Sequence, residues 1–365
     1  MRLPPENSLA IPMIRRAVEL GINYFETSIT YCQNRSEIQL GLALNGIRDN
    51  VYISTKSHVY RKGEMRFGGG VHERDSTGED FKNNLKESLW KLGTDRVDFY
   101  QFHRLTLENL PIAMAKDGPL DALKEAKDSG LVGHIGFTSH DTPANLIKML
   151  DTGEFESVTV HHNLLQTRGN IENPLPAIEH ARVLGVGVII MGPLGGGMLG
   201  IPIEKLRNLV PTTSSQVEMA FRYLLSIPGV TTPISGMTRI SDIEENARIA
   251  SAFQPLSADE MAGIKEVRSK YSALMEQFCI GCGYCQPCPH GVRIPDIFRL
   301  ANTMKIYDIQ EWTRHQYARM RSGALRGSVD LCAECGDCEA KCPQKIRIRD
   351  ELKEAHALLT EAEES

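Results

Sequence analysis

Apolar and polar residues follow two alternating patterns from the start of the chain to about residue 255. Short apolar runs predict strands, and segments with apolar residues three and four positions apart predict helices. The predicted strands cover residues 22–26, 51–55, 97–102, 134–138, 157–161, 186–190 and 230–234. The predicted helices cover residues 8–20, 36–44, 80–92, 119–129, 144–150, 175–184, 214–225 and 241–252.

Strands that alternate with helices in this way indicate a parallel sheet. The pattern approaches a (β/α)8 TIM barrel, which needs eight strands in roughly 250 residues. One strand is missing, and it would precede the first helix, where only residues 1–7 remain. We therefore expect a first strand that is truncated, or a stub at residues 2–4. An open doubly wound sheet is the alternative, but the Gly-rich turn that it requires after its first strand is absent from the sequence.

The pattern changes beyond residue 255. Residues 258–275 predict a connecting helix, residues 294–326 are mostly helical, and residues 350–363 predict a charged closing helix. We divide the chain into a barrel at residues 1–255, a connecting helix at 256–278 and a cysteine-rich domain at 279–365. The arginines near residues 314–326 form a solvated helix face, or a docking patch for an acidic electron carrier.

Eight of the nine cysteines lie in two short groups within the last domain. The first group consists of Cys279, Cys282, Cys285 and Cys288, followed by Pro289. The second group consists of Cys332, Cys335, Cys338 and Cys342, followed by Pro343. Zinc sites of four cysteines are an alternative to an iron–sulfur core, but they usually join separated C-x2-C pairs. Disulfides are disfavoured because a chain of this length can build a core without them.

The second group matches the C-x2-C-x2-C-x3-C-P run of bacterial two-cluster ferredoxins, and the first group is one residue shorter. In that pattern the fourth cysteine of each run serves the other cluster. The resemblance implies two [4Fe–4S] clusters and the ligand sets that follow. One cluster has Cys279, Cys282, Cys285 and Cys342, and the other has Cys332, Cys335, Cys338 and Cys288.

Charge and hydropathy exclude some classes of partner. The formal net charge of −5 offers no electrostatic basis for binding nucleic acid. The most apolar stretch, residues 184–199, is interrupted by glycines and is too short to span a membrane. The N-terminal residues lack the basic and apolar regions of a signal peptide. Together with oxygen-sensitive clusters, this predicts a cytoplasmic protein.

Polar side chains follow three neighbouring strands of the predicted barrel. Glu26 ends one strand and Tyr31 follows it, Lys56 follows the next, and His103 follows the third. Catalytic groups of such barrels lie at the carboxyl ends of the strands. The combination of a carboxylate, a phenol, an ammonium and an imidazole therefore predicts an active site at this end.

These residues resemble the aldo/keto reductase family, and the likeness covers about residues 8–254. The matching segments are 21–27 with Tyr31, 51–56, 89–98 with His103, 133–136, 192–197 and 244–246. The resemblance implies hydride transfer from a nicotinamide to a carbonyl carbon. Tyr31 would be the general acid, Lys56 would lower the pKa of Tyr31, Glu26 would hold Lys56, and His103 would orient the carbonyl. The family normally has aspartate where this chain has Glu26.

The resemblance also implies residues that bind NADP(H). The phosphates would bind to the turn that contains Gly192, Leu194 and Gly196. The adenosine end would lie near Arg239, Glu245 and Asn246, and Arg239 could pair with a 2′-phosphate, which favours NADP. Thr138 and Ser139 replace the family's Ser–Asn pair, and Thr159 replaces its glutamine, so the side-chain amides that hold the nicotinamide are missing.

Three functions fit the sequence. The first is an NADP-linked reductase of a small-molecule carbonyl substrate, with auxiliary clusters. The second is an electron-transfer protein that needs a flavin, or a partner of the ferredoxin or flavodoxin type, because a nicotinamide transfers two electrons and a cluster takes one. The third is a non-catalytic redox sensor on a barrel that has lost its activity.

Overall fold

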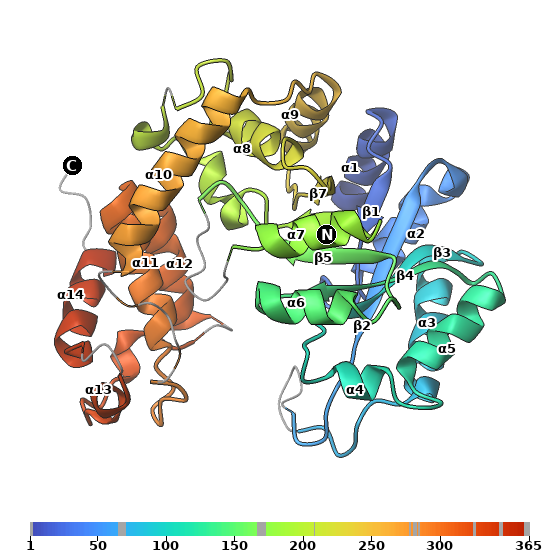
Figure 1. Ribbon diagram of the computed structural model, residues 1–365, viewed down its shortest axis with the longest axis horizontal. Helices are drawn as coiled ribbons and strands as arrows, with labels where there is room; N and C mark the ends of the chain where they lie inside the picture. Colours follow the sequence, from blue (N-terminus) through green and yellow to red (C-terminus); the bar gives the residue numbers. More distant parts are fainter. Residues whose placement is uncertain are drawn as a thin grey trace. The chain divides into compact units, whose positions relative to one another are not determined.

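The structure is a computed structural model that describes residues 3–64, 71–165, 173–207, 209–276, 279, 283, 285–323, 326–342 and 346–360. The chain forms two compact units (Figure 1). Unit 1 comprises residues 1–162, 173–193 and 221–255. Unit 2 comprises residues 163–172, 194–220 and 256–365, so it also takes in a segment that precedes the cysteine-rich part of the chain.

Unit 1 contains a single sheet of seven parallel strands in the described residues, and their spatial order follows their order in the chain. The strands are β1 (Tyr24–Glu26), β2 (Tyr52–His58), β3 (Val97–His103), β4 (Val132–Ser139), β5 (Ser157–His161), β6 (Gly187–Met191) and β7 (Val230–Ile234). This order confirms the predicted TIM-barrel fold. The described residues before the first helix, from Leu3 to Glu6, form no strand.

Several strand bounds differ from the prediction by one to three residues, and the largest difference is at the carboxyl end of β2. β2 extends to His58 rather than residue 55, and β3 extends to His103 rather than residue 102. The two strands pair in register up to His58 and His103. Pairing therefore prolongs β2 by three residues beyond its apolar run.

The predicted helices of the barrel are all present, and a short helix at residues 110–113 was not predicted. The helices are α1 (Asn7–Glu19), α2 (Ser36–Leu44), α3 (Gly78–Leu92), α4 (Leu110–Ala113), α5 (Pro119–Asp128), α6 (Pro143–Leu150), α7 (Leu175–Val183), α8 (Gln216–Leu225) and α9 (Ile240–Ser251). α3 shows why the bounds are sharp: Thr77 and Asp80 form a capping box at its start, and Gly93 is left-handed at its end. α3 and α5 lie side by side (Figure 1).

Aromatic side chains fill the layer between the sheet and these helices. Phe81 of α3 packs against Tyr100 and Phe102 of β3, and all three side chains are fully buried. Burying one such side chain stabilises the fold by roughly 1.5–3 kcal/mol. The sheet is thus held firmly at β2 and β3, the strands that carry Lys56 and His103.

Unit 2 has its own helical core. Its helices are α10 (Ala258–Glu276), α11 (Ile294–Tyr307), α12 (Gln310–Ser322), α13 (Asp337–Lys341) and α14 (Ile348–Thr360). α11, α12 and α14 pack together (Figure 1) around buried Ile297, Tyr317 and Leu352. The helical stretch predicted for residues 294–326 is two helices, because Asp308 is left-handed (φ 56°) and ends α11. No helix in the described part of the chain is long and apolar enough to cross a membrane.

Candidate active site and cluster cavity

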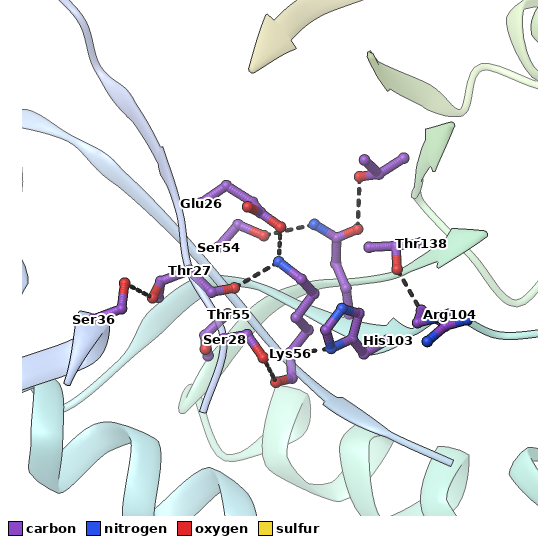
Figure 2. A network of polar contacts seen from close by, with 12 residues as sticks. Glu26, Thr27, Ser28, Ser36, Ser54, Thr55, Lys56, His103, Arg104 and Thr138 are labelled. Atoms are coloured by element: carbon purple, nitrogen blue, oxygen red, sulfur yellow. Dashed lines mark hydrogen bonds and ion pairs between the residues drawn. The ribbon is translucent and has the colours of Figure 1, made fainter. Parts of the chain in front are cut away.

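Lys56 lies inside β2 and is almost completely buried. Its Nζ forms an ion pair with Glu26 Oε1, at the end of β1, and donates a hydrogen bond to the Thr27 carbonyl at 2.7 Å (Figure 2). The Lys56 and Glu26 side chains are only 1% and 9% exposed. Burial lowers the pKa of Lys56 well below its usual range, whereas a paired carboxylate favours the ammonium. Glu26 therefore holds the Lys56 side chain in place, although it is longer than the aspartate that the family normally has here.

Tyr31 lies in the turn between β1 and α2, next to Lys56. Lys56 Nζ lies 4.5 Å from the centroid of the Tyr31 ring, and the ring of His103 meets the Tyr31 ring edge-on at 5.6 Å between centroids. Burial raises the pKa of Tyr31 to about 12, and the nearby Arg104 opposes this change. The net pKa of Tyr31 is therefore raised rather than lowered, because burial outweighs the neighbouring charges.

His103 is the last residue of β3 and lies beside both Tyr31 and Ser28. The Ser28 hydroxyl and His103 Nδ1 are hydrogen-bonded at 3.4 Å (Figure 2). Burial lowers the pKa of His103 far below its usual range, and the charges of Lys56 and His58 lower it further. His103 is therefore a neutral imidazole at neutral pH, and it can donate one N–H to a carbonyl oxygen.

His58 is a site residue that the sequence analysis missed. It ends β2, pairs in register with His103, and stacks on its ring at 4.0 Å between centroids. The Tyr60 ring stacks on the His58 ring at 5.4 Å between centroids, and the His72 ring stacks on the Tyr60 ring at 3.7 Å. Side chains two positions apart on a strand point to the same face, so His58 shares a face with Lys56. This alternation could have identified His58 from the sequence.

Thr138 and Ser139, at the end of β4, use their hydroxyls to hold the chain after β3. Thr138 Oγ1 accepts a hydrogen bond from Arg104 N at 2.8 Å, and Ser139 Oγ donates to the Leu105 carbonyl at 2.7 Å.

Thr159 of β5 is likewise occupied inside the barrel. Its hydroxyl donates to Gln101 Oε1 at 2.9 Å, and Gln101 Nε2 donates to Ser54 Oγ at 2.6 Å. Gln101 is a buried side-chain amide that the sequence analysis did not single out.

The predicted phosphate turn begins directly after β6. Gly192 belongs to unit 1 and has a φ of 69°, and a Cβ on it would lie 2.6 Å from His161 Nε2. Leu194 and Gly196 belong to unit 2, where Gly195, Gly196 and Gly197 also have positive φ angles. Glycine is needed at such positions, because other residues rarely adopt them. Backbone N–H groups in such a turn suit phosphate oxygens.

The predicted adenosine residues lie together on α9. Arg239 precedes the helix, and its side chain is 77% exposed and paired with Asp242 at 2.9 Å. Glu245 and Asn246 lie one turn further along and are half-buried. A phosphate at Arg239 would compete with the Asp242 carboxylate for the guanidinium.

In unit 2, cysteines from both sequence groups line one cavity. Its walls include Cys285, Cys288, Cys332, Cys335 and Cys338, and its empty volume is about 390 Å³ including the open side. Four of these thiols are one complete ligand set implied by the ferredoxin pattern. Lys341 and Arg349 also line the cavity and suit the negative charge of a thiolate-bound iron–sulfur cluster. The donor set therefore fits such a cluster.

The other implied ligand set is only partly visible. Cys279 and Cys342 pack against the apolar core of unit 2, and Cys285 is part of that core. Cys282 lies outside the described residues.

Residues 2–269 match the aldo/keto reductase family, and residues 278–346 match the 4Fe-4S dicluster domain. The chain belongs to the aldo/keto reductase family, an oxidoreductase family, and carries a C-terminal 4Fe-4S domain. The sequence analysis proposed this branch of the family, and the two matches confirm it.

Known relatives cover the barrel. The "uncharacterized oxidoreductase YqkF" of Bacillus subtilis is 27% identical, over 73% of this chain and 89% of its own length. L-galactose dehydrogenase of Arabidopsis thaliana is 26% identical, over 73% of this chain and 84% of its own length. The aldo-keto reductase AKR11C1 of Bacillus halodurans in its holo form is 27% identical with a TM-score of 0.61, over 73% of this chain and 89% of its own.

A fourth relative supports the fold alone. An aldo/keto reductase of Klebsiella pneumoniae, solved in complex with NADP and acetate, is 18% identical with a TM-score of 0.57. The match covers 72% of this chain and 86% of that protein.

Proposed function

We propose that this protein reduces a small carbonyl compound to an alcohol with NADPH. The arrangement of Lys56, Glu26, Tyr31 and His103 in one buried cluster carries the proposal. When bound, the reduced nicotinamide supplies a hydride to the carbonyl carbon. The carbonyl oxygen takes a proton from the protein, so aldehyde or ketone, hydride and proton together give the alcohol.

Tyr31 is the proposed proton donor. A phenol with a pKa of about 12 keeps its proton until an alkoxide, which is a stronger base, develops beside it. Lys56, held by Glu26, places a positive charge against the Tyr31 ring, which stabilises the phenolate as the proton leaves. Neutral His103 can donate a hydrogen bond to the carbonyl oxygen and fix its direction.

The test of this assignment is Tyr31→Phe. We expect kcat/KM for aldehyde reduction by NADPH to fall about 10²- to 10⁴-fold, which is the usual contribution of a positioned acid. Binding of NADPH, measured by fluorescence titration, serves as the control and should not change. Undiminished turnover would show that another group supplies the proton.

The cofactor residues are proposed from the family resemblance. Gly192, Leu194 and Gly196 would hold the phosphates, Arg239, Glu245 and Asn246 the adenosine end, and Thr138 with Ser139 would lie nearest the nicotinamide. The positive φ angles of the glycines support the phosphate turn. The exposed Arg239 guanidinium supports a preference for NADP over NAD.

We also propose two [4Fe–4S] clusters in the C-terminal domain. Cys332, Cys335, Cys338 and Cys288 would hold one, and their shared cavity supports this set. Cys279, Cys282, Cys285 and Cys342 would hold the other. A domain division at residues 255 and 278 and a cytoplasmic location are part of the same proposal, the latter because such clusters are sensitive to oxygen.

An electron-transfer function is the second candidate, and the cysteine-lined cavity favours it. An iron–sulfur cluster exchanges one electron at a time, whereas a nicotinamide gives two as a hydride. A flavin, or a partner of the ferredoxin or flavodoxin type, would have to connect the two.

A further inference from the structure

Arg104 directly follows His103 and holds an uncommon backbone conformation. Its φ is 57°, a left-handed value that residues other than glycine seldom adopt. The Thr138 hydroxyl accepts the Arg104 N–H at 2.8 Å (Figure 2). The Thr138 carbonyl accepts the Leu105 N–H, also at 2.8 Å. The Leu105 side chain is only 1% exposed, and its burial helps to hold the turn in place. The end of β4 therefore fixes the position from which the Arg104 side chain starts.

The charge of Arg104 is not neutralised by the residues that the structure describes. Its side chain is exposed and makes no ion pair within those ranges, whereas Arg96, at the opposite end of β3, pairs with Asp49 at 2.7 Å. The carboxylate nearest in sequence beyond the turn, Glu108, pairs with Arg61 instead. Asp141 accepts hydrogen bonds from Leu107 N and Asn145 Nδ2.

The positive charge of Arg104 acts on the catalytic cluster. After burial, it is the largest influence on the pKa values of Tyr31 and His58, and it also lowers the pKa of His103. The other cation of the cluster, Lys56, is already paired with Glu26. The exposed guanidinium of Arg104, whose backbone is fixed directly after His103, therefore lacks a negative partner within the described residues.

We propose that Arg104 binds an anionic group, a carboxylate or a phosphate, of the carbonyl substrate. Guanidinium binds both groups through two parallel N–H bonds, and such charge-assisted bonds are stronger than neutral ones. The substrate class is then an aldehyde or ketone that carries a negative charge near its carbonyl. The inference rests on the proposed reductase function and names the substrate class of the same site.

The test compares a charged aldehyde with a neutral one of nearly the same shape. The probes are 4-carboxybenzaldehyde and its methyl ester, reduced with NADPH by the full-length protein. We expect Arg104→Gln to lower kcat/KM for the acid about 10- to 100-fold more than for the ester, as the loss of a charge-assisted bond predicts. Arg104→Lys keeps the charge without the planar fork and should recover part of this ratio.

Arg96→Gln is the matched control, because it removes the same charge at the other end of the same strand. Arg96→Gln should leave the ratio of kcat/KM for the acid to kcat/KM for the ester unchanged. An equal fall for both aldehydes in Arg104→Gln, or no fall for either, would overturn the proposal. Glyceraldehyde 3-phosphate and glyceraldehyde form a second pair of charged and neutral aldehydes. The pair in which Arg104→Gln changes the ratio of the kcat/KM values more identifies phosphate or carboxylate as the preferred anion.

A binding measurement separates this proposal from the proposed reaction. The product 4-(hydroxymethyl)benzoate is titrated calorimetrically into wild type, Arg104→Gln and Tyr31→Phe, each saturated with NADP. We expect about 10-fold or more weaker binding in Arg104→Gln only. Binding with this pattern in a protein that reduces neither aldehyde would keep the anion site and refute the reductase function. Equal binding by wild type and Arg104→Gln would refute the anion site.

Discussion

The ion pair of Lys56 and Glu26 shows how one residue can depend on a partner that is far away in the sequence. The two side chains come from neighbouring strands and are 1% and 9% exposed. Burial lowers the pKa of Lys56, and the paired Glu26 carboxylate opposes this by favouring the ammonium. The family's usual aspartate is one methylene shorter, and here the longer carboxylate still reaches Nζ.

Glu26→Gln should therefore destabilise the protein strongly. Removing one partner of a buried ion pair typically lowers the free energy of unfolding by about 3–5 kcal/mol, because the other charge stays buried. Urea unfolding followed by circular dichroism measures this loss. Asp49→Asn, which breaks the exposed pair with Arg96, is the control and should cost about 1 kcal/mol or less. If Glu26→Gln lowered the free energy of unfolding by as little as Asp49→Asn does, Lys56 would be uncharged in the folded protein.

At the scale of elements, the extension of β2 brings His58 into the site. The pairing of β2 with β3 continues to His58 and His103, which places the two imidazoles in a stack. Burial, together with the charges of Arg104 and Lys56, lowers the pKa of His58 to about 4, and the His103 backbone opposes this shift. The charge of His72 also lowers the pKa of His58.

This shift makes stability depend on pH in a defined window. Since the pKa of His58 is about 4 in the fold and about 6.5 in the unfolded chain, the unfolded state binds the extra proton between these values. The free energy of unfolding should therefore fall as the pH drops from about 6.5 to about 4, with about 3 kcal/mol from His58. His58→Gln cannot titrate, and its urea unfolding should show a smaller loss over this window. An identical pH dependence in the variant would assign it to other groups.

At the scale of the whole molecule, the two proposed redox chemistries belong to different units. Unit 1 carries the proposed catalytic residues, and unit 2 carries the cysteine cavity around its own helical core. Each unit has its own apolar core, so the ligands of the proposed clusters belong to unit 2 alone.

Cys335→Ser tests the assignment of the cysteines. The native protein, purified anaerobically, should contain about eight iron atoms, and the variant about four, because one of two four-iron clusters loses a ligand. Cys32→Ser, at the ninth cysteine, lies outside both groups and should leave the iron content unchanged. Zinc in place of iron in the native protein would refute the iron–sulfur assignment, as would an unchanged iron content in Cys335→Ser.

Much of this protein follows from its sequence, because the relevant signals are local. The alternation of strands and helices depends on side chains a few positions apart, so it predicted the order of the sheet and most helix bounds. The cysteine spacing likewise predicted that Cys332, Cys335 and Cys338 lie together, since a short run with thiols three positions apart can surround one small core. Glu26, Lys56 and His103 were found as strand ends for the same reason.

What the tertiary structure alone decided depends on contacts between distant residues. The partners of Thr138 and Ser139 lie after another strand, so no local pattern could show that their hydroxyls hold the turn at Arg104. The direction of the Tyr31 pKa depends on how deeply its ring is buried, and the sequence analysis, which weighed only the charge of Lys56, predicted the opposite. Burial and long-range pairing arise only when the strands assemble, and these two effects determine the chemistry of the site.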